Sequence, residues 1–204
     1  MEQIQTISLA PHHPILECRA CGRPRIYPFY TVLDLGQHAL PVFPKDKNEA
    51  VPVAPLKLVR CGACGVLQLE HTVSRDTLFR DYHYKSGVND TIRADLLDIA
   101  REAQARVPPL GIGDVVLDIG ANDGTLLSYM PDKVIRCGFE PALNLHLETQ
   151  EFLFREYFNA HNYKSHFHQP ARIITAIAMF YDLEDPRAFL RGVAEVLAPG
   201  GIFI

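Results

Sequence analysis

The sequence predicts an α/β chain in which a Rossmann-like parallel sheet follows a smaller N-terminal module. Downstream of residue 110, short and almost wholly apolar segments alternate with helical patterns, as expected for parallel strands covered on both faces. Upstream, proline-rich sequence surrounds two C-x-x-C pairs. We therefore expect a module at 12–80, a connecting loop and helix at 81–109, and the sheet domain at 110–204.

The 204-residue chain is 48% hydrophobic and 22% charged, with a net charge of −4, which is typical of a globular protein. Its Lys and Arg residues are not clustered, so the composition argues against nucleic-acid binding. No apolar run is long enough to span a bilayer, and the N-terminus lacks the basic and then apolar pattern of a secretory signal. We expect a cytoplasmic protein that acts neither on a membrane nor on nucleic acid.

Two C-x-x-C pairs, each followed by glycine, indicate a metal site in the N-terminal module. Four thiolates from two short turns suit tetrahedral Zn²⁺, and the glycine lets each turn form without a Cβ clash. Disulfides, a redox motif and an iron–sulfur cluster are the alternatives, and the absence of an export signal weighs against disulfides. Four cysteines fill the coordination shell, so the zinc would be structural. The expected ligands are Cys18, Cys21, Cys61 and Cys64.

The rest of the module is expected to be irregular, because residues 22–60 carry six prolines and favour loops and short strands. A hairpin is predicted from 56–60 and 66–69, followed by a helix over 74–82 with Ser74 as its N-cap. The remaining cysteine, Cys137, is expected to be buried as a small apolar residue. The histidines are not needed as ligands, and three are expected to be solvated: His161, His166 and His168.

The elements after residue 82 follow the alternation of strand and helix. A loop over 82–87 precedes a helix over 90–106, which the pair Pro108–Pro109 ends. Glycines at 111 and 113 then mark the expected domain boundary. The remaining predictions are strands at 115–120, 134–140, 152–155, 172–180 and 200–204, with helices at 125–130 and 185–197.

The turn after the first apolar strand, residues 118–124, has the place of a cofactor loop. It departs from the dinucleotide pattern G-x-G-x-x-G, because Gly120 fits but Asn122 and Thr125 occupy the other two glycine positions. A pyrophosphate needs a very close approach of the backbone, which Asn122 obstructs. S-adenosylmethionine (SAM) carries no phosphate and makes no such demand.

Two acidic residues support this choice of cofactor. Asp118 precedes the turn, where it could face an ammonium group. Glu140 ends the second strand, 20 residues after Gly120, and suits an acid that accepts hydrogen bonds from both ribose hydroxyls. The alternatives are a turn residue for Asp118 and a solvated strand end for Glu140. Asn122 and Asp123 could cap the following helix, and Asn122 could also bind the ligand.

The segments D-I-G-A-N-D-G-T-L-L (118–127) and G-F-E-P (138–141) resemble those of the class I SAM-dependent methyltransferases. The resemblance implies a class I sheet, here ending at its fifth strand, with a zinc-binding module before it. Met179 and Phe180, at the carboxyl edge of the sheet, are candidates to pack the adenine. The expected cofactor-binding residues are Asp118, Gly120, Asn122, Asp123, Gly124, Glu140, Pro141 and Met179.

A narrower resemblance rests on C-G-A-C-G-V-L-Q-L (61–69), L-F-R-D-Y-H-Y-K-S (78–86) and the segment 173–186. These are similar to the zinc-containing sugar C-methyltransferases, which act on nucleotide-linked 4-keto-deoxysugars in antibiotic biosynthesis. The resemblance implies removal of a proton next to a ketone and methylation of the resulting enolate carbon. Methylation of oxygen or nitrogen in another small metabolite is an alternative, as is a non-catalytic zinc-ribbon scaffold.

Tyrosines are the candidates for the substrate side of the site. The family places a functional tyrosine in a Y-x-Y-x-S segment, which here contains Tyr82 and Tyr84, and we favour Tyr84. Interdomain packing is the alternative for both. Tyr181 lies just past the fourth strand, where ligands approach a parallel sheet. The family continues past the fifth strand into a C-terminal domain that supplies a base, so we expect this chain to be the cofactor and zinc part of a longer one.

Overall fold

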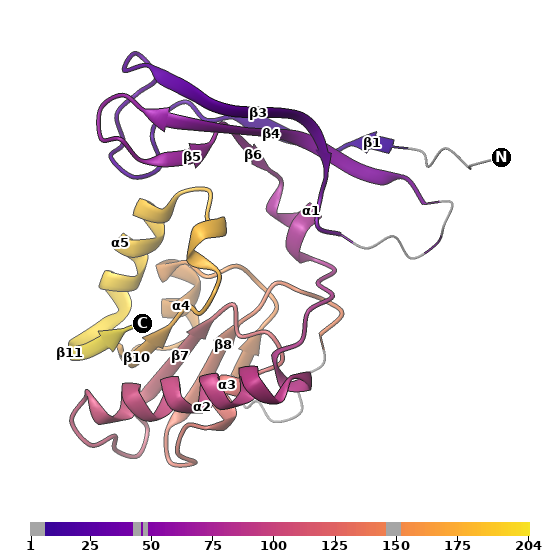
Figure 1. Ribbon diagram of the computed structural model, residues 1–204. Helices are drawn as coiled ribbons and strands as arrows, with labels where there is room; N and C mark the ends of the chain where they lie inside the picture. The colour runs from indigo at the N-terminus through magenta and orange to yellow at the C-terminus, as the bar shows by residue number, and fades with distance from the viewer. Residues whose placement is uncertain (1–6, 43–45, 47–48, 146–151) are drawn as a thin grey trace. The chain divides into compact units, whose positions relative to one another are not determined.

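The computed structural model describes residues 7–42, 46, 49–145 and 152–204, which form two compact units, Met1–His83 and Tyr84–Ile204 (Figure 1). The helix expected at 90–106 is α2, Asp90–Ala105. Its Leu96, Ala100 and Ala103 pack with residues of the parallel sheet, so α2 belongs to the second unit and does not serve as a separate connector.

The first unit is built on two long antiparallel strands, β3 (Phe29–Ala39) and β4 (Val51–Cys61), of 11 residues each. The expectation of loops and short strands over 22–60 is therefore wrong. The prolines are accommodated because two of them, Pro52 and Pro55, lie on β4 where their missing N–H groups do little harm. Pro55 lies opposite a register shift in β3, and among the described residues no strand pairs with β4 on its other side between Val53 and Leu58.

Shorter elements complete the first unit. The predicted hairpin is confirmed, because β5 (Leu67–Leu69) pairs antiparallel with β4. Helix α1 (Arg75–Phe79) is shorter than expected, and Ser74 stands at its N-cap position without a capping hydrogen bond from its side chain. The remaining strands are β1 (Ile7–Leu9), parallel to β4, and the antiparallel pair β2 (His12–Pro14) and β6 (His71–Val73).

The second unit contains the predicted parallel sheet, with strand order β11-β10-β7-β8-β9. All five residues of β7 are buried, Asp118 included, as expected for a largely apolar strand in the middle of a covered sheet. The strands are β7 (Val115–Ile119), β8 (Ile135–Phe139), β9 (Phe152–Phe154), β10 (Ala171–Thr175) and β11 (Leu197–Phe203).

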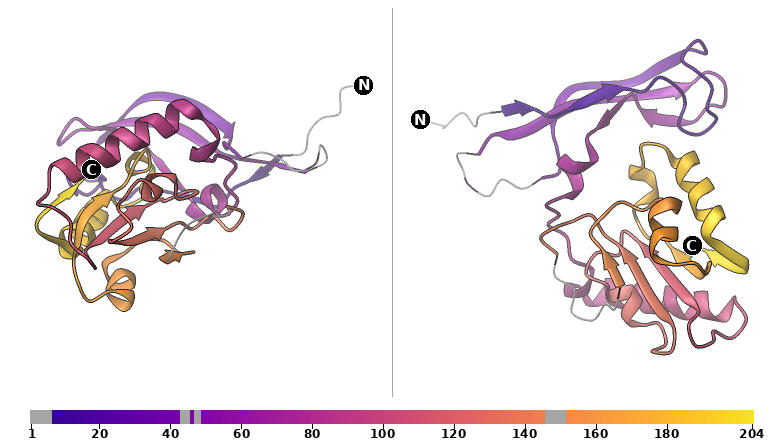
Figure 2. Two further views of the ribbon diagram at one scale, coloured as in Figure 1. Left: turned by 90° about the horizontal axis from the view of Figure 1, so that it is seen from below. Right: turned by 180° about the vertical axis from the view of Figure 1, so that it is seen from behind.

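Helices cover both faces of this sheet. On one face, Leu117 of β7 shares a core with Tyr163 of α4 (Ala160–His166) and Val193 of α5 (Pro186–Val196). On the other face, Val116 packs with α2 and with α3 (Thr125–Ser128). Figure 1 shows the side of the sheet that α2 covers, and the right-hand view of Figure 2 shows the side that α4 and α5 cover. The alternation of side chains along β7 thus supplies two cores and a three-layer domain.

The structure departs from the predictions around the fourth strand. This strand ends at Thr175 and does not continue to 180, because the chain turns at Ala178 (φ 55°) into a 3₁₀ turn, η2 (Phe180–Asp182). Met179 therefore follows the strand and is not part of it.

Helix α4 was not predicted, and it ends at His166. The His166 ring stacks on Phe154 at 3.7 Å, and its Nε2 lies 3.1 Å from Oε1 of Glu156. The residue is nonetheless exposed, as are His161 and His168, so the expectation of solvated histidines is confirmed. Residues 146–151, part of the short link to the third strand, lie outside the described residues. No helix in the described part of the chain is long and apolar enough to cross a membrane.

Candidate zinc and cofactor sites

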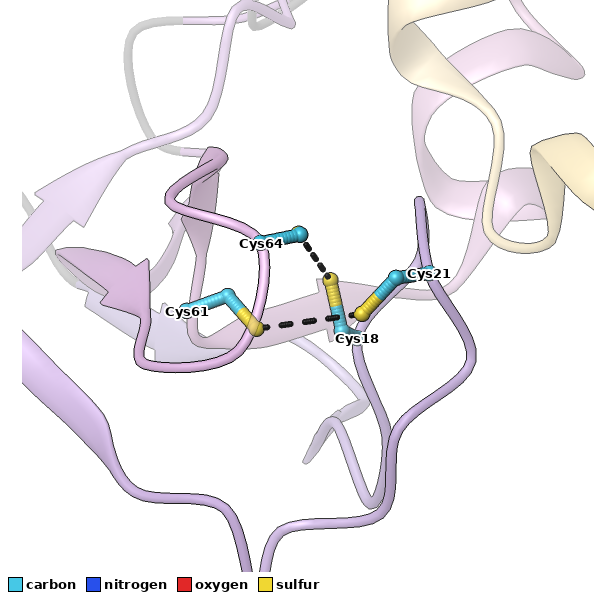
Figure 3. A group of neighbouring side chains, drawn as sticks. All are labelled: Cys18, Cys21, Cys61 and Cys64. Atoms are coloured by element: carbon cyan, nitrogen blue, oxygen red, sulfur yellow. Dashed lines mark hydrogen bonds between the residues drawn. The ribbon is translucent and has the colours of Figure 1, made fainter.

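The four cysteines of the two C-x-x-C pairs converge on one point in the first unit (Figure 3). Their Sγ atoms all lie within 4.8 Å of one another, with Cys18 3.7 Å from Cys64 and Cys21 3.9 Å from Cys61. Four sulfurs bound at about 2.3 Å in a regular tetrahedron would stand about 3.8 Å apart. The cluster therefore fits a Zn²⁺ ion with four cysteine ligands and no open position.

The two turns that carry the cysteines have the same geometry. Gly22 and Gly65 have positive φ angles of 71° and 80°, and their N–H groups donate to the carbonyls of Cys18 and Cys61. The glycine after each pair is thus required by the left-handed backbone, as predicted. Backbone N–H groups of Cys64 and Ala63 point at the Cys61 sulfur and lower its pKa to about 7. Although the backbone N–H of Val66 acts in the opposite direction, burial and the three neighbouring sulfurs raise the pKa of Cys64 to about 12, so Cys61 is the more readily ionised of the two.

The other cysteine and the N-terminal histidines take no part in this cluster. Cys137 is fully buried in β8, and burial raises the pKa of its thiol, so it is the apolar packing residue that was predicted. His12 lies with its Nδ1 2.8 Å from the carbonyl of Ala10. Among the described residues, the metal-ligand group contains the four cysteines and no histidine.

The predicted cofactor loop turns sharply at the carboxyl end of β7. Gly120 (φ 76°), Asn122 (φ 54°) and Gly124 (φ 80°) are all in the left-handed region, and the N–H groups of Gly120 and Ala121 donate to the carbonyl of Phe139. Asn122 thus adopts a backbone conformation that asparagine tolerates better than most residues.

Side chains of the loop take the roles that follow from its shape. Asp123 lies one residue before Gly124, the N-cap of α3, and its Oδ1 accepts hydrogen bonds from the backbone N–H (3.2 Å) and the hydroxyl (2.6 Å) of Thr125. Asn122 does not cap this helix. Its Oδ1 accepts from the N–H of Ser86 at 2.9 Å, and its Nδ2 donates to the carbonyl of Tyr84 at 3.0 Å.

Asp118 is a buried carboxyl group at the end of the central strand β7, with 4% of its surface exposed. Its Oδ1 accepts a hydrogen bond of 2.6 Å from the hydroxyl of Thr175 on β10. Burial and the nearby Glu140 raise its pKa to about 7, while the hydroxyl of Thr175 acts in the opposite direction. No basic side chain of the described residues forms an ion pair with Asp118, which leaves this acid available to a cationic ligand group.

Glu140 lies one residue past the end of β8 and is also buried. Its Oε2 accepts from the backbone N–H of Asn122, and its Oε1 accepts from the N–H of Ala142, both at 2.8 Å. Burial raises its pKa, and these two N–H groups and Arg155 partly offset the effect. The alternative of a solvated strand end is therefore excluded. The carboxylate is held rigidly beside the loop.

Two neighbours of Glu140 and Gly120 complete the site. Met179 covers the loop, because its Cγ lies 3.3 Å from the point where a Cβ on Gly120 would stand. Arg155, which sequence reasoning missed, donates to the carbonyls of Ala142 and Leu145 and so fixes the turn that begins at Pro141. The only signal for it was a basic residue at the end of the strand predicted at 152–155, which in the structure ends at Phe154.

The structure brings one of the candidate tyrosines to the cofactor loop. Tyr84 is held through its carbonyl by Asn122, and 39% of its surface is exposed. Tyr82 belongs to the first unit, where its ring packs against Phe79 and His83. Tyr181 lies in η2 with 76% of its surface exposed, and Phe180 packs against Phe189 of α5.

A parallel sheet of this order, with buried acids at the carboxyl ends of its two central strands, defines a class I methyltransferase domain, whose cofactor is SAM. A family of methyltransferase domains matches residues 84–204, and a zinc-binding domain family matches residues 18–79. The chain belongs to this methyltransferase domain family, and it carries the zinc-binding domain before it.

One curated protein is similar to this chain in sequence, and two solved structures are similar to part of it. The C-methyltransferase NovU from Streptomyces niveus is 27% identical over 201 residues, which cover 93% of this chain and 46% of that protein. This chain thus spans about half the length of that curated relative. A solved SAM-dependent methyltransferase from Geobacter sulfurreducens, in complex with S-adenosyl-L-homocysteine, has a TM-score of 0.37 at 18% identity, over 53% of this chain and 46% of that one. The plantazolicin methyltransferase BpumL, with the same ligand, also has a TM-score of 0.37, at 16% identity over 50% and 41% of the two chains.

The residues at the end of the sheet fit SAM on their own chemistry. A buried acid without a basic partner suits the ammonium group of the methionine part, which is the role expected of Asp118. A second buried carboxylate, Glu140, is rigidly placed and keeps oxygen lone pairs beyond the two that accept backbone N–H groups. SAM supplies an electrophilic methyl group when bound.

Proposed function

We propose that the protein methylates a carbon next to the ketone of a nucleotide-linked deoxysugar, with SAM as the methyl donor. The observation that carries the proposal is the continuous match to a C-methyltransferase, which covers 93% of the chain and so includes both units. The Y-x-Y-x-S segment and the four-cysteine cluster, which point to the same narrower group, both lie within the described residues.

The chain's own residues would hold the donor in a defined orientation. Asp118 would accept the ammonium group, and Glu140 would accept the ribose hydroxyls, while Met179 and Gly120 would form the floor of the loop. Because Asp118 and Glu140 are nearly desolvated, each hydrogen bond to the donor would be stronger there than at the surface. The cofactor would thus be bound by charge and hydrogen bonds at the ends of β7 and β8.

Tyr84 would act on the acceptor sugar. Its backbone is fixed to the cofactor loop, and its partly exposed side chain could donate to the ketone oxygen, on which negative charge develops as the neighbouring carbon loses its proton. The proton goes to a base, the carbon forms a bond to the methyl group, and the sulfonium becomes a thioether. Tyr82 and Tyr181 remain candidates for further contacts with the sugar.

The test is methyl transfer by the full-length natural protein from SAM labelled with ¹³C in its methyl group. A nucleotide-linked 4-keto-deoxysugar is the acceptor, and NMR locates the label. We expect a new carbon–carbon bond next to the ketone, and we expect Tyr84→Phe to lower kcat while the Kd for S-adenosyl-L-homocysteine (SAH) stays within about threefold, because the lost hydroxyl would act on the acceptor. A label on oxygen or nitrogen would overturn C-methylation but keep the methyltransferase. Absence of SAH binding would overturn both.

A further inference from the structure

The segment Tyr84–Gly87 is bound to the cofactor loop by two side chains that sequence reasoning had assigned to helix capping or ligand binding. Asn122 accepts from the N–H of Ser86 at 2.9 Å and donates to the carbonyl of Tyr84 at 3.0 Å. Oδ2 of Asp123 accepts from the N–H of Gly87 at 2.7 Å. Three hydrogen bonds therefore join three residues of this segment to two consecutive residues, which lie 36 or 38 positions further along the chain.

Gly87 makes this close approach possible. A Cβ on Gly87 would stand 2.9 Å from Oδ2 of Asp123 and 2.9 Å from Oγ1 of Thr125, so a side chain at this position would force both groups to move. The segment therefore lies directly on the loop, with no space between them at this point. It then continues through the short 3₁₀ turn η1 (Ser86–Val88) into α2, whose N-cap is Asn89.

Asn122 also connects this segment to the expected ribose acid. Its backbone N–H donates to Oε2 of Glu140, while its side chain holds Tyr84 and Ser86. Glu140, Asn122 and the segment thus form a continuous hydrogen-bonded chain within the second unit. A ligand that fixes Glu140 and the loop would reduce the entropy lost when the segment is ordered, and such a coupling must act in both directions.

We propose that Asn122 and Asp123 are positioning residues that couple occupation of the cofactor site to the ordering of Tyr84–Gly87. Their side chains act on the protein segment and not on SAM. The proposal rests on the function proposed above, because it makes the position of Tyr84 in the site more ordered when the donor is bound. It assigns to these two residues a role on the acceptor side of the reaction.

The test is amide hydrogen exchange at Ser86 and Gly87, measured by NMR with and without SAH. Asn122→Gly removes the side chain but suits the φ angle of 54°, so this variant should fold and keep the backbone bond to Glu140. Without SAH, we expect Ser86 in this variant to exchange about tenfold faster than in the natural chain, as loss of about 1.4 kcal/mol of local stability requires. Saturating SAH should slow exchange at both amides in the natural chain, but it should not slow exchange at Ser86 in Asn122→Gly, in which Asp123 still binds Gly87.

Two further variants separate positioning from simple structural damage. Asn122→Asp keeps the acceptor for Ser86 and loses the donor to Tyr84, so it should restore protection at Ser86. In another turn, the carboxylate of Asp114 accepts a similar hydrogen bond from the backbone N–H of Gly111. Asp114→Ala removes that bond and should leave exchange at Ser86 and Gly87 unchanged.

Three outcomes would overturn the proposal. The clamp, meaning the three hydrogen bonds from Asn122 and Asp123 to Tyr84–Gly87, does not exist if Ser86 exchanges equally fast in Asn122→Gly and in the natural chain. Asn122 is a cofactor ligand if the variant loses SAH binding while exchange at Ser86 stays slow. A natural chain that binds no SAH overturns the proposed function and the coupling together, whereas exchange measured without ligand still decides whether the clamp exists.

Discussion

The hydroxyl of Thr175 on β10 donates a hydrogen bond of 2.6 Å to Oδ1 of Asp118 on the neighbouring strand β7. Thr175 is fully buried and Asp118 nearly so, which means that this bond lies in the protein interior, at the carboxyl ends of the two strands, and not in solvent. It fixes the direction of a carboxyl group whose pKa burial has raised to about 7. A threonine on one strand thus controls both the orientation and the ionisation of an acid on the next.

Binding of SAH should depend on pH through Asp118. The ionised acid attracts the ligand's ammonium group and the neutral acid does not, so affinity should rise with pH across the pKa of about 7. The ionised fraction rises about tenfold between pH 6 and pH 8, and isothermal titration should show a similar fall in Kd. Asp118→Asn should bind weakly at both values with little dependence on pH. A natural chain whose Kd is equal at pH 6 and pH 8 would contradict this role.

The stability of the ligand-free domain should fall as pH rises, whereas the affinity for SAH should rise. The pKa of Asp118 is raised from 3.8 when the protein folds, so between pH 4 and pH 7 the native state binds more protons than the unfolded state. The free energy of unfolding contributed by this group must therefore fall as pH rises through that window. Denaturant titrations of the natural chain and Asp118→Asn measure the effect, and the variant should lose less stability over the window. The raised pKa of Glu140 acts in the same direction in both proteins and cancels in the comparison.

Thr175→Val should destabilise the domain and change its dependence on pH. Valine fills nearly the same volume but leaves a buried oxygen of Asp118 without its donor, at a cost of about 1–3 kcal/mol in the free energy of unfolding. Because the Thr175 hydroxyl lowers the pKa of Asp118, its loss should move the midpoint of SAH binding to higher pH. Thr175→Ser keeps the hydroxyl and is the matched control. If Thr175→Val and Thr175→Ser have the same stability and the same pH midpoint of SAH binding, the hydrogen bond to Asp118 controls neither property.

Removing the Glu140 carboxylate should weaken both the cofactor loop and SAH binding. Glu140→Ala leaves the backbone N–H groups of Asn122 and Ala142 without their acceptor, which costs about 1–3 kcal/mol for each buried group. Loss of a charged partner for the ribose hydroxyls should weaken SAH binding by about tenfold to a hundredfold. Titration calorimetry at a temperature where the variant remains folded separates the two effects. Glu102→Gln, on the exposed surface of α2, should change neither.

Local chemistry explains which parts of the sequence were predictable. The run Val115–Ile119 is apolar except for Asp118, which favours a strand in a sheet covered on both faces, and β7 is buried at every position. The glycine after each C-x-x-C pair predicted two turns with positive φ, which Gly22 and Gly65 confirm. Each of these patterns depends only on residues that are neighbours in the chain, so it predicts the local structure without knowledge of the tertiary structure.

The relationships that define the site depend on residues far apart in the sequence. Nothing near Asn122 indicates that its side chain binds Tyr84 and Ser86, because its own environment equally suits a helix cap. The bond from Thr175 to Asp118 crosses two strands that are 57 residues apart. The long strand β4 escaped prediction for a related reason, since the pairing of its neighbours decides whether a proline at position 55 is tolerated.

The purified protein should contain one zinc ion per chain, and the first unit should need it. Four thiols packed within 4.8 Å have no stable arrangement other than around a metal or as disulfides. Elemental analysis by mass spectrometry measures the ratio, and chelation should unfold the first unit while the parallel sheet keeps its circular dichroism. Cys18→Ser should lower the ratio, whereas Cys137→Ser, outside the cluster, should not. A ratio near zero, or two disulfides in the intact mass, would contradict the zinc site.

Gly138→Ala tests how tightly the cofactor loop rests on the sheet. Gly138 lies on β8 beneath the loop, and an added Cβ would stand 2.9 Å from Cβ of Ala121 and 2.9 Å from Cδ1 of Leu153. One contact belongs to the cofactor loop and both belong to packed side chains, so the methyl group should cost about 1–3 kcal/mol in the free energy of unfolding. Displacement of Ala121 should also weaken SAH binding.

The matched control for this substitution is Gly192→Ala in the middle of α5. There the added Cβ would meet its nearest neighbours at an ordinary 3.6 Å, and alanine favours the helix by about 0.5–1 kcal/mol. Denaturant titration should therefore show the two glycine-to-alanine changes moving stability in opposite directions, with SAH affinity altered only by Gly138→Ala. If Gly138→Ala is neutral in both measurements, the loop yields to the methyl group, and the rigid placement of the residues at the end of β7 and β8 would have to come from the hydrogen bonds of Glu140 alone.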